Sequence, residues 1–271
     1  MTGAPFIVTH EGAVAHLRFT RPQAANAMTL RFWDEFPHAV AELDAGGETR
    51  ALVISGEGRN FCAGMDVSVF ESDMLQPDRS ASEREAFVHS VRKFQAALTC
   101  LARARFPVVA AIQGACVGGG LDLAVACDLR FVSADAYFRV EEINIGMMAD
   151  LGSLERGARA LPQAKIREMA FCGRTLRAEE AVALGFVNAI AADPLVAAFT
   201  AAREVAARSP LAVAASKAAL NYAADHALAD SLEHTALLQA AMWSSAEVRA
   251  AMTARAKKSA AEFAGLKTLT R

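Results

Sequence analysis

The chain has 271 residues, 54% of them hydrophobic and 21% charged, which is the composition of a folded protein and excludes wholesale disorder. Its formal net charge of −2 gives no sign of the basic surface that nucleic acids or anionic membranes attract. The longest uncharged stretch, residues 106–121, contains proline, glutamine and glycines and is too short to span a membrane. We therefore expect a globular chain that binds neither nucleic acid nor membrane.

The five cysteines are odd in number and include no Cys-x-x-Cys pair, which argues against a disulfide framework or a zinc site and favours a reducing compartment. The first residues, MTGAPFIVTHEG, lack the basic start and apolar stretch of a signal peptide. The last four, TLTR, differ from a peroxisomal signal. The expected location is the cytoplasm.

Short β-rich stretches alternate with longer helical ones over about the first 140 residues. Residues 6–10 and 14–19 flank a Glu-Gly pair and predict a β-hairpin. The stretch 29–43 predicts a helix that begins at a threonine cap. The apolar run 51–55 (ALVIS) predicts a buried strand, and 82–105 has apolar residues at helical spacing.

The same order then repeats. Residues 108–113 (VVAAIQ) predict a second buried strand, and 121–126 a short apolar helix. Two further strands are expected at 129–133 and 137–140.

Helices dominate after residue 150, with one last strand expected at 186–190. The helical stretches are 163–171, 178–184, 193–208, 210–224, 229–243 and 246–263. The sequence thus predicts an α/β core over residues 1–200, followed by a helical region over 201–271.

Two glycine-containing elements each follow a predicted buried strand. The first, residues 59–66, reads RNFCAGMD, and the second, residues 113–122, reads QGACVGGGLD. Each combines a strand, a turn and a helix start, where backbone N–H groups lack partners and the helix dipole is positive. Two such ends directed at one point would form an oxyanion hole. The alternative is that the glycines only permit tight turns and close packing.

Other well-known site motifs are missing. Neither glycine element is followed by the Gly-Lys-Ser/Thr of a phosphate-binding P-loop. The sequence also lacks GxGxxG, HExxH and GxSxG, so dinucleotide, zinc-protease and serine-hydrolase sites have no support.

Carboxylates in apolar surroundings are the second chemical signal. Asp122 lies in GGLDLAVAC, Glu141 and Glu142 in FRVEEINIG, and Asp150 in GMMADLGSL. Any one of them is more often a helix cap or a solvated group. If two or three share an apolar pocket, burial raises their pKa values and repulsion separates them, which allows a proton donor and a proton acceptor at neutral pH.

These features occur in an order that resembles the enoyl-CoA hydratase/isomerase (crotonase) superfamily, from about residue 6 to residue 263. The resemblance implies a spiral of ββα units, acyl-CoA substrates, and a C-terminal helical trimerisation region that makes a homotrimer or homohexamer. The matching segments are Arg21-Pro22, Asn26-Ala27-Met28, 61–66, 110–122 and 138–146.

By this resemblance, the backbone N–H groups of Met65 and Gly119 would hold the thioester carbonyl as it becomes an enolate. Neighbouring residues of the two motifs are expected at the substrate, although Asp66 is more often a structural helix-start carboxylate in this motif than a proton carrier. These neighbours are Ala63, Gly64, Asp66 and Gly118.

Three cations are candidates for the CoA phosphates, namely Arg21, Lys257 and Lys258, partly across a subunit boundary. For the lysines the alternative is a solvated helix end. Three aromatic residues are candidate walls of the acyl pocket, with ordinary core packing as the alternative. They are Phe61, Phe70 and Phe87.

The set of Asp122, Glu142 and Asp150, with the GxxADxGxL pattern, is similar to that of the Δ3,5-Δ2,4-dienoyl-CoA isomerases. Typical hydratases carry Glu at the first position and no acid at the third. The resemblance implies that Asp150 is the base at the α-carbon and Glu142 the acid at the distal carbon. Asp122 would lie between or near them and tune their pKa values or grip the substrate. The mechanism that the resemblance implies requires no metal or redox cofactor, and CoA is part of the substrate.

Two alternatives remain. A hydratase would use Asp122 and Glu142 to hold a water that adds to a 2-trans-enoyl-CoA, which leaves Asp150 without a role. A member that binds RNA or has lost activity is the other alternative. Its basic helix is not evident, since the basic residues form short, dispersed pairs.

Overall fold

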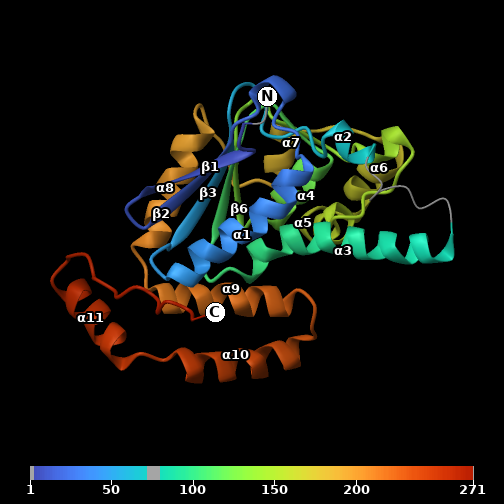
Figure 1. Ribbon diagram of the computed structural model, residues 1–271. Helices are drawn as coiled ribbons and strands as arrows, with labels where there is room; N and C mark the ends of the chain where they lie inside the picture. Colours follow the sequence, from blue (N-terminus) through green and yellow to red (C-terminus); the bar gives the residue numbers. More distant parts are fainter. Residues whose placement is uncertain (1–2, 72–79, 271) are drawn as a thin grey trace.

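The computed structural model describes residues 3–71 and 80–270 and confirms an α/β core followed by helices (Figure 1). In chain order its elements are β1 (Phe6–Glu11), β2 (Val14–Phe19), η1 (Pro22–Ala24), α1 (Leu30–Gly46), β3 (Ala51–Gly56), α2 (Val67–Phe70), α3 (Ala81–Arg103), β4 (Val108–Ile112), β5 (Ala115–Val117), α4 (Gly119–Ala126), β6 (Leu129–Val132), β7 (Tyr137–Arg139), η3 (Glu142–Ile145), α5 (Ser153–Ala160), α6 (Gln163–Cys172), β8 (Leu176–Arg177), α7 (Ala178–Ala183), β9 (Ala189–Ile190), α8 (Pro194–Ala206), α9 (Pro210–Ala223), α10 (Leu228–Met242) and α11 (Ser245–Ala256).

The larger sheet has the strand order β1-β2-β3-β4-β6-β9. The β1–β2 hairpin is antiparallel, and every later pair of neighbours in this sheet is parallel. In register, Leu52 faces Val108, and Val109 faces Leu129. Strand β4 is buried throughout, because parallel strands are covered on both faces, and this explains the unbroken apolar run.

A smaller sheet, of order β5-β7-β8, lies beside the first. Strand β5 follows β4 and β7 follows β6, so successive turns of the chain place one strand in each sheet before a helix closes the turn. Two isolated parallel β-bridges, one between Cys62 and Cys116 and one between Met28 and Met65, pair residues of successive turns in the same way. The expected spiral of ββα units is confirmed.

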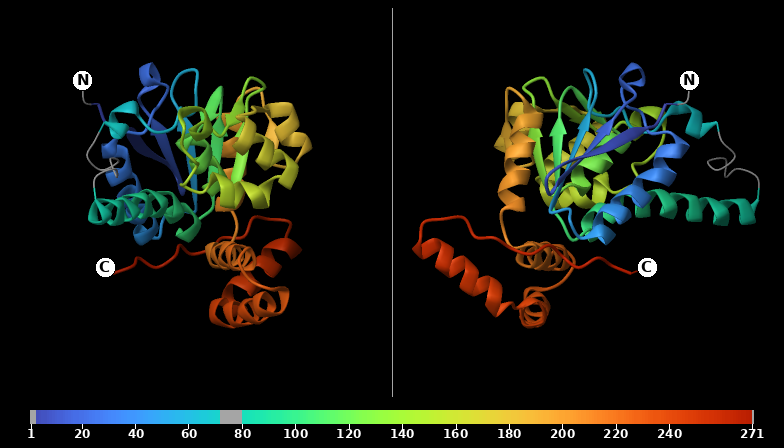
Figure 2. Two further views of the ribbon diagram at one scale, coloured as in Figure 1. Left: turned by 90° about the vertical axis from the view of Figure 1, so that its right-hand side faces the viewer. Right: turned by 60° about the vertical axis from the view of Figure 1, so that its left-hand side comes forward.

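Helices cover both faces of the larger sheet (Figure 2). The main core contains buried side chains of α1, α3 and α4, including Phe32, Phe94 and Leu121. On the other face, Ala198 and Ala202 of α8 pack against strands β2, β3 and β4. The expected limit of the core at residue 200 falls within α8, which stays on the sheet to Ala206.

The helices α9, α10 and α11 extend away from the sheets (Figure 1). Helix α9 is joined to the core by the buried Lys217, whose Nζ donates to Leu101 O at 2.6 Å, Phe106 O at 2.9 Å and Asp128 Oδ2 at 2.8 Å. Of the helices in the described residues, none has the length and apolar character needed to cross a membrane.

Several elements differ from expectation, and the last strand, expected over 186–190, is confined to Ala189–Ile190. The helix expected over 246–263 ends at Ala256, because Lys258 adopts a φ of +53° and the Ser259 N–H turns back to Ala254 O. Helix α4 begins at Gly119, earlier than the expected residue 121, because Gly118 is its N-cap. Helix α5 was not expected, since it is short and contains a glycine.

Candidate active site

A cavity of about 90 Å³ brings together the two predicted oxyanion donors and two of the three predicted acids. Its walls are otherwise largely apolar and come from α2, α3 and the segment before α5. The lining residues are Met65, Phe70, Phe87, Val91, Phe94, Gly119, Glu142, Met147, Asp150 and Leu151. The cavity therefore has the composition of a site that binds an apolar chain beside acid/base groups.

The amides of residues 65 and 119 are neighbours. A Cβ on Gly64, whose φ is +91°, would lie 3.0 Å from Gly119 N, and a Cβ on Gly119 would lie 3.5 Å from Met65 N. Neither Met65 N–H nor Gly119 N–H donates a hydrogen bond to any residue that the structure describes. Because Gly119 opens α4, the helix dipole adds positive potential at this point. The pair has the properties of an oxyanion hole.

Glu142 lies at the start of η3, after β7, and faces this turn. Its Oε1 is 3.2 Å from the position that a Cβ on Gly118 would take, and its buried Oε2 has no hydrogen-bond partner in the described residues. Burial raises the pKa of Glu142. The charges of Asp150 and Glu141 raise it further, while the main-chain N–H groups of Glu142 and Glu141 oppose the rise.

Asp150 lies in the loop between η3 and α5. Burial raises the pKa of its carboxyl, and Glu155 adds to the rise, while the residue's own N–H opposes it. Its main-chain carbonyl accepts a hydrogen bond of 2.7 Å from Gln95 Nε2 of α3. Two acids with raised pKa values thus share one cavity.

Asp122 is fully buried in the first turn of α4 and does not line the cavity. Its Oδ1 accepts from Ser153 N at 2.6 Å and from Ser153 Oγ at 2.5 Å, while Oδ2 is buried without a partner in the described residues. Burial and the charge of Glu142 raise the pKa of Asp122 to about 7, against the opposing hydrogen bonds of Ser153. The Asp122 carboxyl therefore links α4, which begins at Gly119, to the start of α5, which follows Asp150.

The first glycine element is held in place by polar contacts. Ala63 N–H donates to Ala25 O at 2.9 Å, and Asp66 caps α2 by accepting from Ser68 N. Arg21 pairs with Asp66 at 2.8 Å. Although burial raises the pKa of Asp66, the hydrogen bonds from Ser68 and Arg21 lower it overall. Within one chain, Asp66 is thus a helix-start carboxylate.

The predicted CoA-binding cations do not meet in one chain. Arg21 lies beside α2 through its ion pair, whereas Lys257 and Lys258 follow α11. Helices α2 and α11 lie on opposite sides of the molecule in every view (Figures 1 and 2).

Of the predicted aromatic walls, Phe70 and Phe87 line the cavity, while Phe61 is in the core with its ring edge-on to Phe19.

The sequence reasoning missed Ser153, the partner of Asp122. It also missed part of the cavity lining, namely Val91, Phe94, Met147 and Leu151. Val91 and Phe94 belong to the apolar face that helical spacing predicts for residues 82–105, although of this face only Phe87 was expected to line the cavity. No local signal identified Ser153. Among the described residues, no group of three or more His, Cys, Asp or Glu is placed to hold a metal ion.

The spiral of two sheets and the paired free amides define the class of crotonase-fold, acyl-CoA enzymes. Residues 9–266 match the family model described as enoyl-CoA hydratase/isomerase, and the chain belongs to this family.

Relatives with solved structures or curated names agree with this assignment. The mitochondrial Δ(3,5)-Δ(2,4)-dienoyl-CoA isomerase of Mus musculus is 35% identical over 91% of this chain and 78% of its own length. The peroxisomal enzyme of that name from Arabidopsis thaliana is 35% identical over 94% of both chains. The structure of an enoyl-CoA hydratase from Polaromonas sp. JS666 matches with a TM-score of 0.86 and 26% identity, covering 96% of this chain and 99% of that one.

Proposed function

We propose that the protein isomerises 3,5-dienoyl-CoA thioesters to 2,4-dienoyl-CoA thioesters. One observation carries the proposal, namely that Glu142 and Asp150 line the same small apolar cavity as the free amides of Met65 and Gly119. The isomerase relatives support it. A 1,5 proton shift needs a base near the thioester, an acid farther along the acyl chain and donors for the enolate oxygen. We assign these roles to Asp150, to Glu142 and to the two amides, in that order.

In this mechanism the Asp150 carboxylate removes a proton from the α-carbon. The electron pair of the broken C–H bond delocalises along the diene and onto the thioester oxygen. The N–H groups of Met65 and Gly119 hold that oxygen, each contributing about 3–4 kcal/mol to the stability of the dienolate. Water is largely excluded by the apolar walls, which strengthens these interactions.

Glu142, in its protonated form, then gives its proton to the far carbon of the dienolate, and the double bonds shift to positions 2 and 4. To act as this proton donor, Glu142 must stay protonated while Asp150 is ionised. The negative charge of Asp150 helps, because it raises the pKa of Glu142. After turnover, a proton must leave Asp150 and one must return to Glu142.

Asp122 supports this distribution of protons without touching the substrate. The carboxyl is buried, one of its oxygens is occupied by Ser153, and it interacts electrostatically with Glu142. The same burial weighs against a hydratase, in which Asp122 and Glu142 would have to hold a water together at the cavity.

The function is tested by supplying 3,5-octadienoyl-CoA and crotonyl-CoA separately and following 2,4-dienoyl-CoA absorbance and hydration. We expect at least a hundredfold preference in kcat/KM for isomerisation. Equal or faster hydration of crotonyl-CoA would contradict the proposal and establish the hydratase.

Further parts of the proposal concern assembly. We propose a homotrimer or homohexamer, in which Lys257 and Lys258 approach CoA phosphates bound by another copy. The reaction itself is proposed to need no metal or redox cofactor.

A Gly64→Ala variant is expected to lower kcat/KM for isomerisation about 10²-fold, which corresponds to the loss of one oxyanion donor. The new methyl group would lie 3.0 Å from Gly119 N and from Val117 O, at a φ of +91° that L side chains rarely adopt. The matched control is Gly185→Ala, with a φ of +73° and nothing within 4 Å of the added Cβ. Equal losses in steady-state assays of both variants would show that strain alone is responsible.

The stability of the protein is expected to fall as pH rises, through Asp122. Its pKa is about 7 when folded and 3.8 as a free side chain, so its contribution is fully present below pH 3.8 and is lost as pH rises through 7. Between about pH 5 and pH 8 this amounts to about 3 kcal/mol in the free energy of unfolding.

Urea denaturation of an Asp122→Asn variant at several pH values measures this effect, and most of the slope should disappear. Asp135→Asn is the control, because Asp135 is an exposed carboxylate that accepts from Ser133 in a turn. A slope that persists in Asp122→Asn would place the titration elsewhere.

A further inference from the structure

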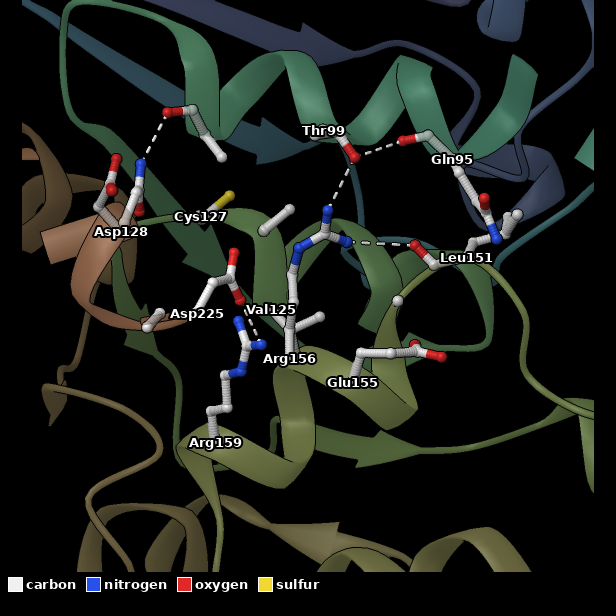
Figure 3. Close-up of a pocket in the computed structure, with 15 residues that line it drawn as sticks. Gln95, Thr99, Val125, Cys127, Asp128, Leu151, Glu155, Arg156, Arg159 and Asp225 are labelled. Carbon is white, nitrogen blue, oxygen red and sulfur yellow. Dashed lines mark hydrogen bonds and ion pairs between the residues drawn. The ribbon is translucent and has the colours of Figure 1, made fainter. Parts of the chain in front are cut away.

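A second cavity, of about 550 Å³, lies behind the loop that carries Asp150 (Figure 3). Leu151 lines both this cavity and the catalytic one, so the two are separated by the loop itself. The polar side chains nearest the loop come from α3 and α5, which flank it, while Asp128, Asn221 and Asp225 line the cavity farther away. None of them belongs to the acid/base set described above.

Two of these side chains bind the main chain of the loop, and a third, Thr99, links them. Gln95 Nε2 donates to Asp150 O at 2.7 Å, and Arg156 Nη1 donates to Leu151 O at 3.2 Å. The other arm of the guanidinium, Nη2, donates to Thr99 Oγ1 at 2.9 Å, and Thr99 Oγ1 in turn donates to Gln95 O at 2.7 Å (Figure 3). These bonds form a continuous network from α3 to two consecutive carbonyls of the loop.

The environment of Arg156 indicates that the network serves orientation. Its guanidinium is partly buried, and in the described residues it has no carboxylate within ion-pair distance, so its side-chain hydrogen bonds go to neutral oxygens. Arg159, one turn along the same helix and in the same cavity, pairs with Asp225 instead. Burial lowers the pKa of Arg156, and the charges of Asp122 and Glu155 oppose this at longer range, so the direct bonds of the guanidinium are left to hold the loop and α3.

We propose that Gln95, Thr99 and Arg156 are positioning residues that direct the Asp150 carboxylate into the catalytic cavity. The bond to Asp150 O holds the peptide plane that follows the Asp150 Cα, and the bond to Leu151 O holds the next plane along the chain. Together they restrain the backbone on the C-terminal side of Asp150, and therefore the direction of its side chain. On the C-terminal side, the Ser153–Asp122 bonds fix the end of the same segment. The inference rests on the proposed role of Asp150, and a displacement of about 1 Å at a reacting group costs on the order of 10² in rate.

The test uses three variants of nearly unchanged size, Gln95→Met, Thr99→Val and Arg156→Met. We expect kcat for isomerisation to fall about tenfold in the first two and about 10²-fold in the third, with KM within about twofold of wild type. Exchange of the α-proton into heavy water should fall in parallel, because it reports the proton transfer to Asp150 without the later transfer from Glu142. Thr99→Ser should restore the wild-type kcat, and the control Arg159→Met should keep it.

Gln95→Met and Thr99→Val change no charge, so they separate orientation from electrostatics. If both keep the wild-type kcat, the proposal is overturned, even if Arg156→Met is slow through the lost charge near Asp122. A fall in kcat matched by an equal rise in KM would also overturn it, since binding would then be the affected step.

Failure of the proposed function is recognised separately. If the wild-type protein isomerises no dienoyl-CoA, the proposed function is contradicted. The hydrogen-bond network can still be tested in that case, by measuring amide deuterium exchange over residues 149–153. Faster exchange there in Gln95→Met and Thr99→Val than in Arg159→Met supports the network. Unchanged exchange in both overturns it.

Discussion

Replacing Asp150 with asparagine is expected to lower the isomerisation rate about 10⁴-fold and to abolish exchange of the substrate's α-proton into heavy water. The amide is nearly the same size as the carboxyl but cannot accept the proton, and this loss lies at the upper end of general-base effects. The Gln95 contact involves the Asp150 carbonyl and is retained, so the loop should keep its place. Rapid-mixing absorbance and proton NMR in heavy water give the two rates.

Glu155→Gln is the matched control, since it removes a nearby carboxylate from the exposed side of α5. It should keep the maximal rate within about twofold. The charge of Glu155 raises the pKa of Asp150, so the control should also move the acid limb of the pH–rate profile to lower pH. An Asp150→Asn variant that still exchanged the α-proton at the wild-type rate would remove Asp150 from the role of base.

A Glu142→Gln variant is expected to lose isomerisation about 10³-fold while it still exchanges the α-proton. The amide cannot deliver a proton to the distal carbon, but the base and the oxyanion donors remain, so the dienolate should form and revert. This separation of the two steps distinguishes Glu142 from Asp150 in one pair of assays. Loss of both rates together would instead assign Glu142 to the first proton transfer.

Glu141→Gln is the adjacent control. The Glu141 carboxylate forms an ion pair with Arg139, so it is held on that side chain. Its charge raises the pKa of Glu142, and the control should therefore move the alkaline limb of the pH–rate profile to lower pH with little change in the maximum. A tenfold or larger loss in Glu141→Gln would mean that the two neighbours share the acid role.

The regular elements were predictable where their signal is local. The runs at β3 and β4 are apolar because both faces are covered, and Thr29 caps α1 as expected. The strands β5 and β8 were missed because they span three and two residues, so only their pairing partners define them. The end of the last helix depends on the positive φ of one lysine, Lys258, which periodicity does not reveal.

The candidate site shows the same limit. The glycine elements and the acids carry their chemistry in adjacent residues, so motif order could predict that Met65, Gly119, Glu142 and Asp150 share one cavity, although Asp122 does not line it. Contacts between residues far apart in the sequence could not be predicted in this way. Ser153 is 31 residues from its partner Asp122, and Arg156 is 57 from Thr99. Such contacts depend on how α3, α4 and α5 pack, and a serine or arginine looks the same in sequence with or without them.

The free amides of Met65 and Gly119 have a consequence for how such a site changes over generations. Both donors belong to the main chain, so a point mutation at residue 65 that keeps the backbone path alters a side chain and leaves the donor in place. The proposed proton-transfer groups, by contrast, are single side chains that one codon change replaces. Under the proposed mechanism, the donors to the thioester oxygen are therefore inherited with the fold, whereas the proton transfers can be changed one acid at a time.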